Sequence, residues 1–265
     1  MHARTTVILT GTFTLVSCIA QESALAPEIV LQRSSQANRG LQTVEVHAFM
    51  LTKDKENDEK ARLSLQGQLQ HAGTELFAHI TIDTQGESTT MFHMIILQDG
   101  SILITEPRQT TANTPYSTQS IETEEWIPLI PPTHQQAVEQ FPLLDIQKQG
   151  IHITKDRGIS LLRNKKHYSY ATVMDNRFGE EFVIRGELWV DIHTFFTSRI
   201  VWNIEKEQQQ HATLNIDVFS HNTVPPFSVP KHIRTISEEE RQKLLERILT
   251  ITPPFLQTLL EAKPL

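Results

Sequence analysis

Cysteine is almost absent from this sequence, since Cys18 is the only one among 265 residues. No disulfide can form within the chain, so packing and hydrogen bonds must hold the fold. A basic surface is lacking as well, because 31 Asp and Glu outnumber 24 Lys and Arg and give a formal net charge of −7. Nucleic-acid binding needs a basic face that neutralises phosphates, and adsorption to anionic lipid by charge needs one too. The charge balance argues against both.

Catalytic and metal-binding motifs are also missing. The sequence has no GxSxG elbow, no Gly-rich phosphate loop and no HExxH, and its 12 histidines are scattered without ligand-type spacing. His79 and His93 are one pair that adjacent strands can bring face to face. The acidic clusters at Glu122 to Glu125 and at Glu180 and Glu181 suit solvated loops better than a glycosidase pair. We therefore expect no enzyme, no metal and no cofactor.

The N-terminus reads as an export signal. Met1 to Arg4 is a short, weakly basic start, and Thr5 to Val16 is an uncharged, largely apolar run. That run is well short of the ~20 residues needed to cross a bilayer as a helix, and it has the length of a signal-peptide core. No second apolar run is long enough to span a membrane.

The segment Leu15-Val16-Ser17-Cys18 resembles the bacterial lipobox. The resemblance implies cleavage after Ser17 and a diacylglyceryl group on the thiol of Cys18, with acyl chains of the palmitate type holding the protein at a membrane. Two or three chains give stable anchoring, at about 0.8 kcal/mol per buried CH₂. The alternatives are an ordinary secretory signal with a coincidental cysteine, or an uncleaved anchor. We expect an extracytoplasmic protein attached to a bacterial cell membrane or outer membrane.

Four segments follow from this division: a signal peptide at 1–17, a lipidated tether at 18–26, a β-rich domain at 27–234 and a C-terminal helical extension at 235–265. The stretch Pro27 to Gly40 predicts a helix, because proline suits a first turn and glycine an end. Thr133 to Phe141 predicts a short helix capped by its threonine. Ser237 with Glu240 forms a capping box that opens a helix to about Leu249.

Strand signals dominate the rest of the chain. Apolar and polar residues alternate through Leu63 to Gln70 and through Leu76 to Ile82, which is typical of half-buried antiparallel strands. Asp99-Gly100 predicts a hairpin turn. The further predicted strands are 41–52, 91–97, 101–105, 150–154, 159–163, 167–174, 182–191, 199–205 and 211–219. The expected fold is mainly β (α+β), a strongly curved antiparallel sheet of about nine or ten strands with helices on one face.

The order of these features resembles the LppX/LprG-type lipoproteins and the wider LolA/LolB-like group. The match begins with the lipobox, Pro27-Glu28-Ile29-Val30-Leu31 and the strand after Gly40, and it includes Ile95 to Ile104 and Glu125-Trp126-Ile127-Pro128-Leu129. It ends with Glu187-Leu188-Trp189-Val190-Asp191 and with Asp217 to Asn222 before Val229-Pro230. The resemblance covers roughly 27–233 and implies a half-barrel wrapped around helices on its concave face, with an apolar cavity for acyl chains. The helix from Ser237 and the long loop Gln109 to Glu122 depart from the pattern.

A lipid-binding role would be physical and not covalent. The aligned apolar residues that we expect to line the cavity are Leu63, Leu65, Leu69, Ile80, Ile184, Leu188, Ile200, Trp202, Ile204, Leu214 and Ile216. The same alternation is equally typical of a filled core packed against helices. Three functions follow. The first is a lipoprotein that carries or transfers a lipid, or the acyl chains of another lipoprotein, across the envelope. The others are a sensory or regulatory module that binds an envelope protein partner, and a passive envelope protein that assembles through the helix at Ser237.

Overall fold

The computed structural model describes residues 25–53, 59–71, 75–84, 88–110, 124–130, 150–174, 182–206 and 209–251. The elements in these ranges are α1 (Pro27–Arg39), β1 (Thr43–Lys53), β2 (Glu59–Gln70), β3 (Glu75–Thr84), β4 (Ser88–Ile96), β5 (Ile102–Ile104), β6 (Arg108–Thr110), β7 (Ile127–Ile130), β8 (Ile151–Leu162), β9 (Lys165–Met174), β10 (Phe182–Asp191), β11 (Thr197–Lys206), β12 (Gln209–Phe219) and α3 (Glu238–Ile251). Ser17, Cys18, the helix predicted at 133–141 and most of the loop predicted at 109–122 lie outside the described residues.

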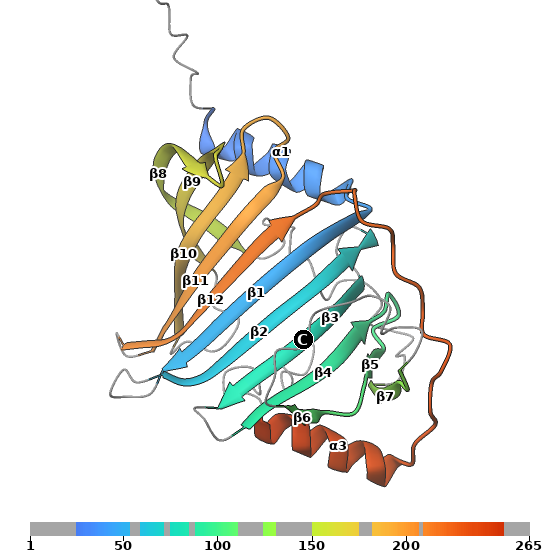
Figure 1. The fold of residues 1–265 in the computed structure, drawn as a ribbon. Coiled ribbons are helices and arrows are strands. Elements are labelled where there is room, and N and C mark those ends of the chain that lie inside the picture. The colour runs from blue at the N-terminus through green and yellow to red at the C-terminus, as the bar shows by residue number, and fades with distance from the viewer. Residues whose placement is uncertain are drawn as a thin grey trace, which may run out of the picture.

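The twelve strands form one sheet, in the order β7-β5-β4-β3-β2-β1-β12-β11-β10-β9-β8, with β6 paired to β4. Neighbouring strands are antiparallel throughout. The first strand lies beside the last, so one half of the sheet runs outward from β1 and the other returns from the β8 edge to β12 (Figure 1). The chain thereby closes at the centre of the sheet, while the sheet itself remains an open structure with β7 and β8 at its ends.

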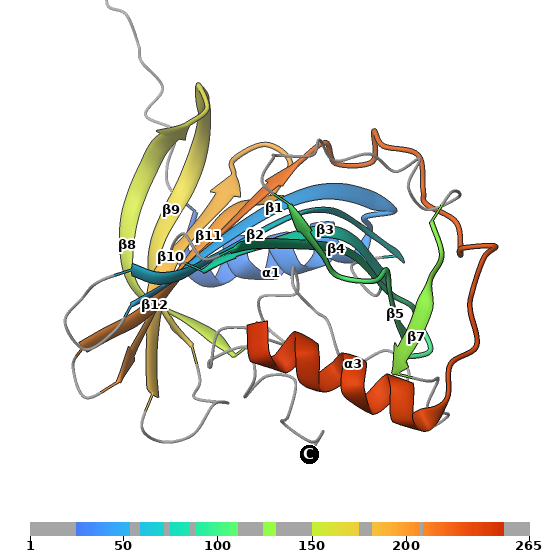
Figure 2. The ribbon, with the colours of Figure 1, turned by 60° about the horizontal axis from the view of Figure 1, so that its bottom comes forward.

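The sheet arches over two helices that lie on the same side of it (Figure 2). Val30 of α1 and Ile248 of α3 belong to one apolar cluster with residues of most strands. The expected fold class is confirmed: a mainly β, curved antiparallel half-barrel with a C-terminal helix. The concave side of the arch is therefore the side that holds the main core.

Helix α1 begins and ends where the sequence predicts. Pro27 occupies the first turn together with the acidic Glu28, and Arg39 stands in the last turn, where each charge opposes the helix dipole. The backbone N–H of Gly40 donates to the carbonyl of Ala37 at 3.1 Å. The buried side of the helix is mostly polar, which the run of apolar residues at its start does not indicate.

Strand β8 corrects the two separate strands predicted at 150–154 and 159–163. The structure has one strand from Ile151 to Leu162 with irregularities between Ile153 and Lys155 and between Asp156 and Ile159. The side chain of Asp156 accepts a hydrogen bond from the N–H of Gly158 at 2.7 Å, and Gly158 has φ +79°. This local turn interrupts the alternation without ending the strand, because bulges let a ladder resume beyond them.

The structure also decides three smaller points: a predicted turn, two short strands and a predicted helix cap. The Asp99-Gly100 turn is confirmed, since the N–H of Gly100 donates to the carbonyl of Leu97 at 2.9 Å. Strands β6 and β7 were not predicted, because they are short and β7 contains Pro128. The capping box at α3 is confirmed: the N–H of Glu240 donates to Ser237 Oγ at 3.2 Å, and Glu240 Oε2 accepts from the N–H of Ser237 at 3.0 Å.

Among the described residues, no helix is both long and apolar enough to cross a membrane.

Candidate functional site

The concave side of the sheet is lined by rows of apolar side chains, called the apolar face here. Directly opposed residues of neighbouring strands lie on the same face of a sheet. One such row consists of Tyr170, Leu188, Ile200, Ile216, Ala48, Leu65, Ile80 and Phe92. The next consists of Gly186, Trp202, Leu214, Met50, Leu63 and Ile82. Ile184 faces Ile204 in a third row, and Leu69 faces Leu76 in a fourth.

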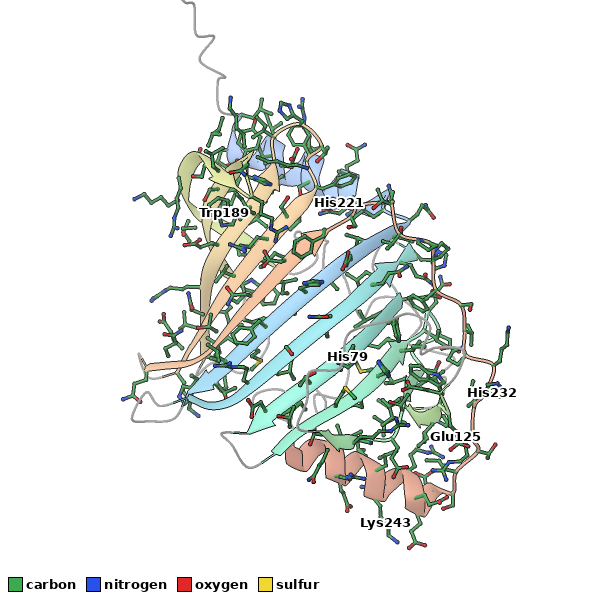
Figure 3. All side chains as sticks on the ribbon, in the orientation of Figure 1. His79, Glu125, Trp189, His221, His232 and Lys243 are labelled. Atoms are coloured by element: carbon green, nitrogen blue, oxygen red, sulfur yellow. The ribbon has the colours of Figure 1, made fainter. Side chains whose placement is uncertain are left out.

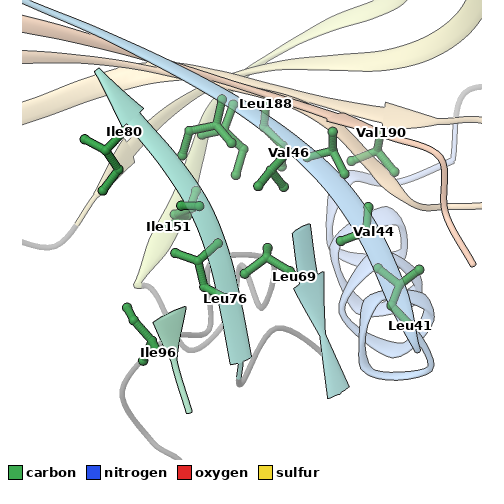
Figure 4. Packing of buried hydrophobic residues seen from close by; sticks show 14 of the residues in the cluster. Leu41, Val44, Val46, Leu69, Leu76, Ile80, Ile96, Ile151, Leu188 and Val190 are labelled. Atoms are coloured by element: carbon green, nitrogen blue, oxygen red, sulfur yellow. The ribbon is translucent and has the colours of Figure 1, made fainter. Parts of the chain in front are cut away.

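All eleven predicted residues therefore lie on the apolar face, although they come from five strands. Seven are buried, namely Leu69, Ile80, Ile184, Leu188, Ile200, Ile204 and Ile216. Leu63, Leu65, Trp202 and Leu214 are only part-buried. Sequence reasoning missed Ala48, Met50 and Tyr170, which share these rows. Figure 4 shows the packing of part of the face from close by.

Helix α1 is held to the apolar face by a small polar cluster. Asn38 Nδ2 donates to Thr197 Oγ1 at 2.9 Å, and Asn38 Oδ1 accepts from the N–H of Thr197 at 3.3 Å. Ser34 Oγ lies 3.3 Å from the same threonine hydroxyl. All three residues are buried, so their mutual hydrogen bonds offset the cost of removing these groups from water. Val30 is the one fully buried apolar residue of this helix.

Helix α3 meets the other end of the face. Ile248 is buried in the main core, and Leu244 and Leu245 pack against it while part-exposed. Arg247 Nη2 donates to the carbonyl of Pro107 at 3.1 Å, which ties the helix to the segment before β6. The face is thus bounded by α1 at one end and by α3 at the other (Figure 2).

Two glycines shape the middle of the face. A Cβ on Gly186 would lie 1.9 Å from the carbonyl oxygen of Val201 and 3.0 Å from Trp202 Cδ1. A Cβ on Gly67 would lie 2.4 Å from the carbonyl oxygen of Phe77. Both positions exclude any side chain because the neighbouring strand approaches too closely. Trp202 is therefore able to lie directly over the backbone at Gly186.

The convex side carries a chain of titratable groups on β3 and β4. His79 faces His93 across β3 and β4, as predicted, with Nδ1 of the first 3.0 Å from Nε2 of the second. His93 Nδ1 lies 2.5 Å from Glu124 Oε2, and Thr81 Oγ1 lies 3.4 Å from His79 Nε2. Figure 3 shows His79 on β3. Burial, followed by the neighbouring His93, lowers the pKa of His79.

A long connection attaches to the convex side at the end of β2. In the segment between β12 and α3, the carbonyls of Pro225 and Phe227 accept hydrogen bonds from the side chains of Gln68 and Gln70 at 2.8 and 3.2 Å. Phe227 packs with Phe77 and Trp126 in a second apolar cluster. Glu124 thus joins the convex packing instead of lying in solvent as expected. The ring of His93 lies 5.8 Å from that of Phe77 and 6.5 Å from that of Trp126 between centroids, so the histidine chain adjoins this second cluster.

The sequence raised two further kinds of site, a metal site and the lipidation and cleavage sites at the N-terminus. No group of three or more His, Cys, Asp or Glu in the described ranges is arranged to hold a metal ion. The lipidation site Cys18 and the cleavage site Ser17 fall outside those ranges and stay predictions.

Comparison with known proteins finds no matching family model and no matching curated protein. Solved structures do match. The lipoprotein LppX of Mycobacterium tuberculosis matches with a TM-score of 0.46 and 10% identity over 77% of this chain and 100% of that chain. LprF of Mycobacterium bovis matches with a TM-score of 0.45 and 13% identity over 77% and 98%. A LolA superfamily protein of Nitrosomonas europaea matches with a TM-score of 0.23 and 9% identity over 82% and 97%.

These are the groups named from the sequence. The similarity to LppX, LprF and the LolA superfamily protein lies at TM-scores below 0.5 and at identities of 13% or less. A shared fold hosts many functions, so the function must be argued from the residues of this chain.

Proposed function

We propose that the chain is an exported lipoprotein that binds a lipid against its apolar face and carries or transfers it within the cell envelope. The observation that supports this most is a group of part-buried apolar side chains from the two main rows of the face. Leu63 and Leu65 lie on β2, Trp202 on β11 and Leu214 on β12, three strands of the continuous run β11-β12-β1-β2, yet none of the four is fully covered. Part-exposed apolar groups that adjoin one another typically mark a binding surface.

The energetic requirement fits a face of this kind. A two-chain lipid exposes some thirty methylenes, so leaving the membrane for water costs on the order of 20 kcal/mol. A carrier must replace the lost environment with a continuous apolar surface. The two described rows run across β10, β11, β12, β1, β2 and β3 without a charged residue, and Leu63, Leu65, Trp202 and Leu214 are their part-exposed members.

The proposed anchor is the diacylglyceryl group on Cys18 after cleavage behind Ser17. It would keep the domain at the membrane surface while the apolar face exchanges lipid. A Cys18→Ser variant should leave the membrane fraction and lose the mass of the lipid modification. If Cys18→Ser and the unaltered chain fractionate alike, the anchor is wrong.

The binding proposal is tested with Leu65→Gln, which places an amide in the middle of the apolar face. We expect the affinity for a fluorescent two-chain phospholipid to fall by about tenfold, because the amide loses hydrogen bonds to water when an acyl chain covers it. The matched control is Leu161→Gln on β8, where the leucine is 70% exposed. Equal affinities of the two variants would contradict lipid binding at this face.

A filled core is the competing arrangement, and seven buried residues of the predicted set are compatible with it. In that case the chain would act as an extracytoplasmic sensory or regulatory module that binds an envelope protein. Capture of one partner that is lost when residues 109–122 are shortened, together with no lipid in the purified protein, would favour this second function.

A further inference from the structure

Tyr170 differs from its neighbours on the apolar face because its side chain ends in a polar hydroxyl group. It lies on β9 directly opposite Leu188, at the end of the row that continues through Ile200 and Ile216 to Leu65. Its side chain is fully buried, with 0% exposure. Its ring stacks on that of Tyr168, with centroids 6.5 Å apart and an angle of 17° between the planes.

The hydroxyl of Tyr170 has no hydrogen-bond partner among the described residues. A buried hydroxyl normally finds one, because leaving it unpaired forfeits its hydration without compensation. The polar groups at α1 show the contrast, since Ser34 and Asn38 bond to Thr197. Burial raises the pKa of Tyr170, so the group stays protonated near neutral pH and can donate.

We propose that the Tyr170 hydroxyl is the polar anchor of the lipid site and donates a hydrogen bond to an ester carbonyl of a bound glycerolipid. This inference rests on the proposed function. The acceptor must reach a group that is shielded from water, and an apolar molecule that enters along the apolar face can carry one to it. An acyl ester is such a molecule: its chain extends over the row toward Leu65, while its carbonyl oxygen meets the hydroxyl.

The anchor also gives the site a chemical preference. A carbonyl that accepts from Tyr170 is present in ester-linked lipids and absent from ether-linked ones of the same chain length. A site that hydrogen-bonds one group of its ligand discriminates against the analogue that lacks it. The ester lipid should therefore bind about tenfold more tightly than its ether analogue, which corresponds to about 1.4 kcal/mol.

The test compares a diacyl phosphatidylcholine with its dialkyl ether analogue, by titration of the chain from residue 19 onward, which retains every described element. Tyr170→Phe removes the hydroxyl alone. We expect it to lower the affinity for the diacyl lipid about tenfold, to leave the ether lipid within about twofold, and to fold at least as stably as the unaltered chain. The matched control is Tyr168→Phe on the neighbouring ring, which should change neither affinity by more than about twofold.

The outcomes separate the two proposals. If the unaltered chain binds both lipids equally and Tyr170→Phe changes nothing, the anchor is overturned while lipid binding stands. An equal loss of both lipids in Tyr170→Phe also overturns it, because the hydroxyl would then act on the shape of the site. If the unaltered chain binds neither lipid, the proposed function fails and the anchor fails with it.

Discussion

Replacing Asn38 by alanine tests whether polar contacts hold α1 on the concave face. The change removes two hydrogen bonds to Thr197, of 2.9 and 3.3 Å. It leaves the N–H of Thr197 without this acceptor, beside the register shift between Trp189 and Val190, in a residue that is 0% exposed.

The magnitude follows from these contacts. Each lost bond contributes about 1 kcal/mol, and an unpaired buried N–H adds about 1–3 kcal/mol. We expect Asn38→Ala to lower the free energy of unfolding by about 3 kcal/mol in urea titrations followed by tryptophan fluorescence.

The control lies on the same helix. Gln36 is exposed, and Gln36→Ala should change the free energy of unfolding by less than about 0.5 kcal/mol. If Asn38→Ala is as harmless as Gln36→Ala, apolar contacts alone hold the helix, and the reasoning about the polar cluster is wrong.

Three other predictions concern stability. Burial is the largest cause that lowers the pKa of His79, His167 and His221 below the ordinary 6.5. Below about pH 6.5 the unfolded chain therefore binds protons that the folded chain does not, and the free energy of unfolding should fall between about pH 7 and pH 5. A free energy that stays constant or rises in urea titrations over this range would refute this. Gly186→Ala places a Cβ 1.9 Å from a backbone oxygen and should lower the free energy of unfolding by about 3 kcal/mol or more. Gly40→Ala is the control and should be tolerated, because its Cβ meets its nearest neighbour at 3.4 Å. Equal thermal midpoints of the two variants would show that β10 and β11 separate freely. Ser237→Ala removes the cap of α3 and should speed amide hydrogen exchange in that helix, at a cost of about 1 kcal/mol, and unchanged exchange rates would mean that the cap contributes nothing.

Alternation and end signals made much of the fold predictable. The two-residue period placed Leu63, Leu65 and Leu69 on one face, and the structure confirms that placement. The capping box at Ser237 located the start of α3 because its side-chain bonds are local in sequence. Such features can be recognised without knowing which strands pair.

Non-local contacts were beyond the sequence. Asn38 and Thr197 are 159 residues apart, so no local pattern shows that the buried side of α1 is polar. Glu124 appears in a polar loop, and only the folded sheet brings it to His93. The interruption at Asp156 to Gly158 looked like the end of a strand, because a bulge and a turn use the same residues.

The sequence indicated which residues share the apolar face, but not how deeply each of them is buried. Its rows could be listed from the sequence, but the part-burial of Trp202 and Leu214 depends on which strands adjoin. Tyr170 lay within a predicted strand, yet its missing partner is a property of the assembled face. Burial and satisfaction of polar groups therefore required the three-dimensional arrangement.

Native mass spectrometry of the chain from residue 19, produced in a bacterial periplasm without the anchor and followed by organic extraction, tests the central claim most directly. Lipid binding at the apolar face predicts a species heavier than the polypeptide by the mass of a lipid, and the same lipid in the extract. A folded monomer of polypeptide mass, with no lipid in the extract, would contradict it.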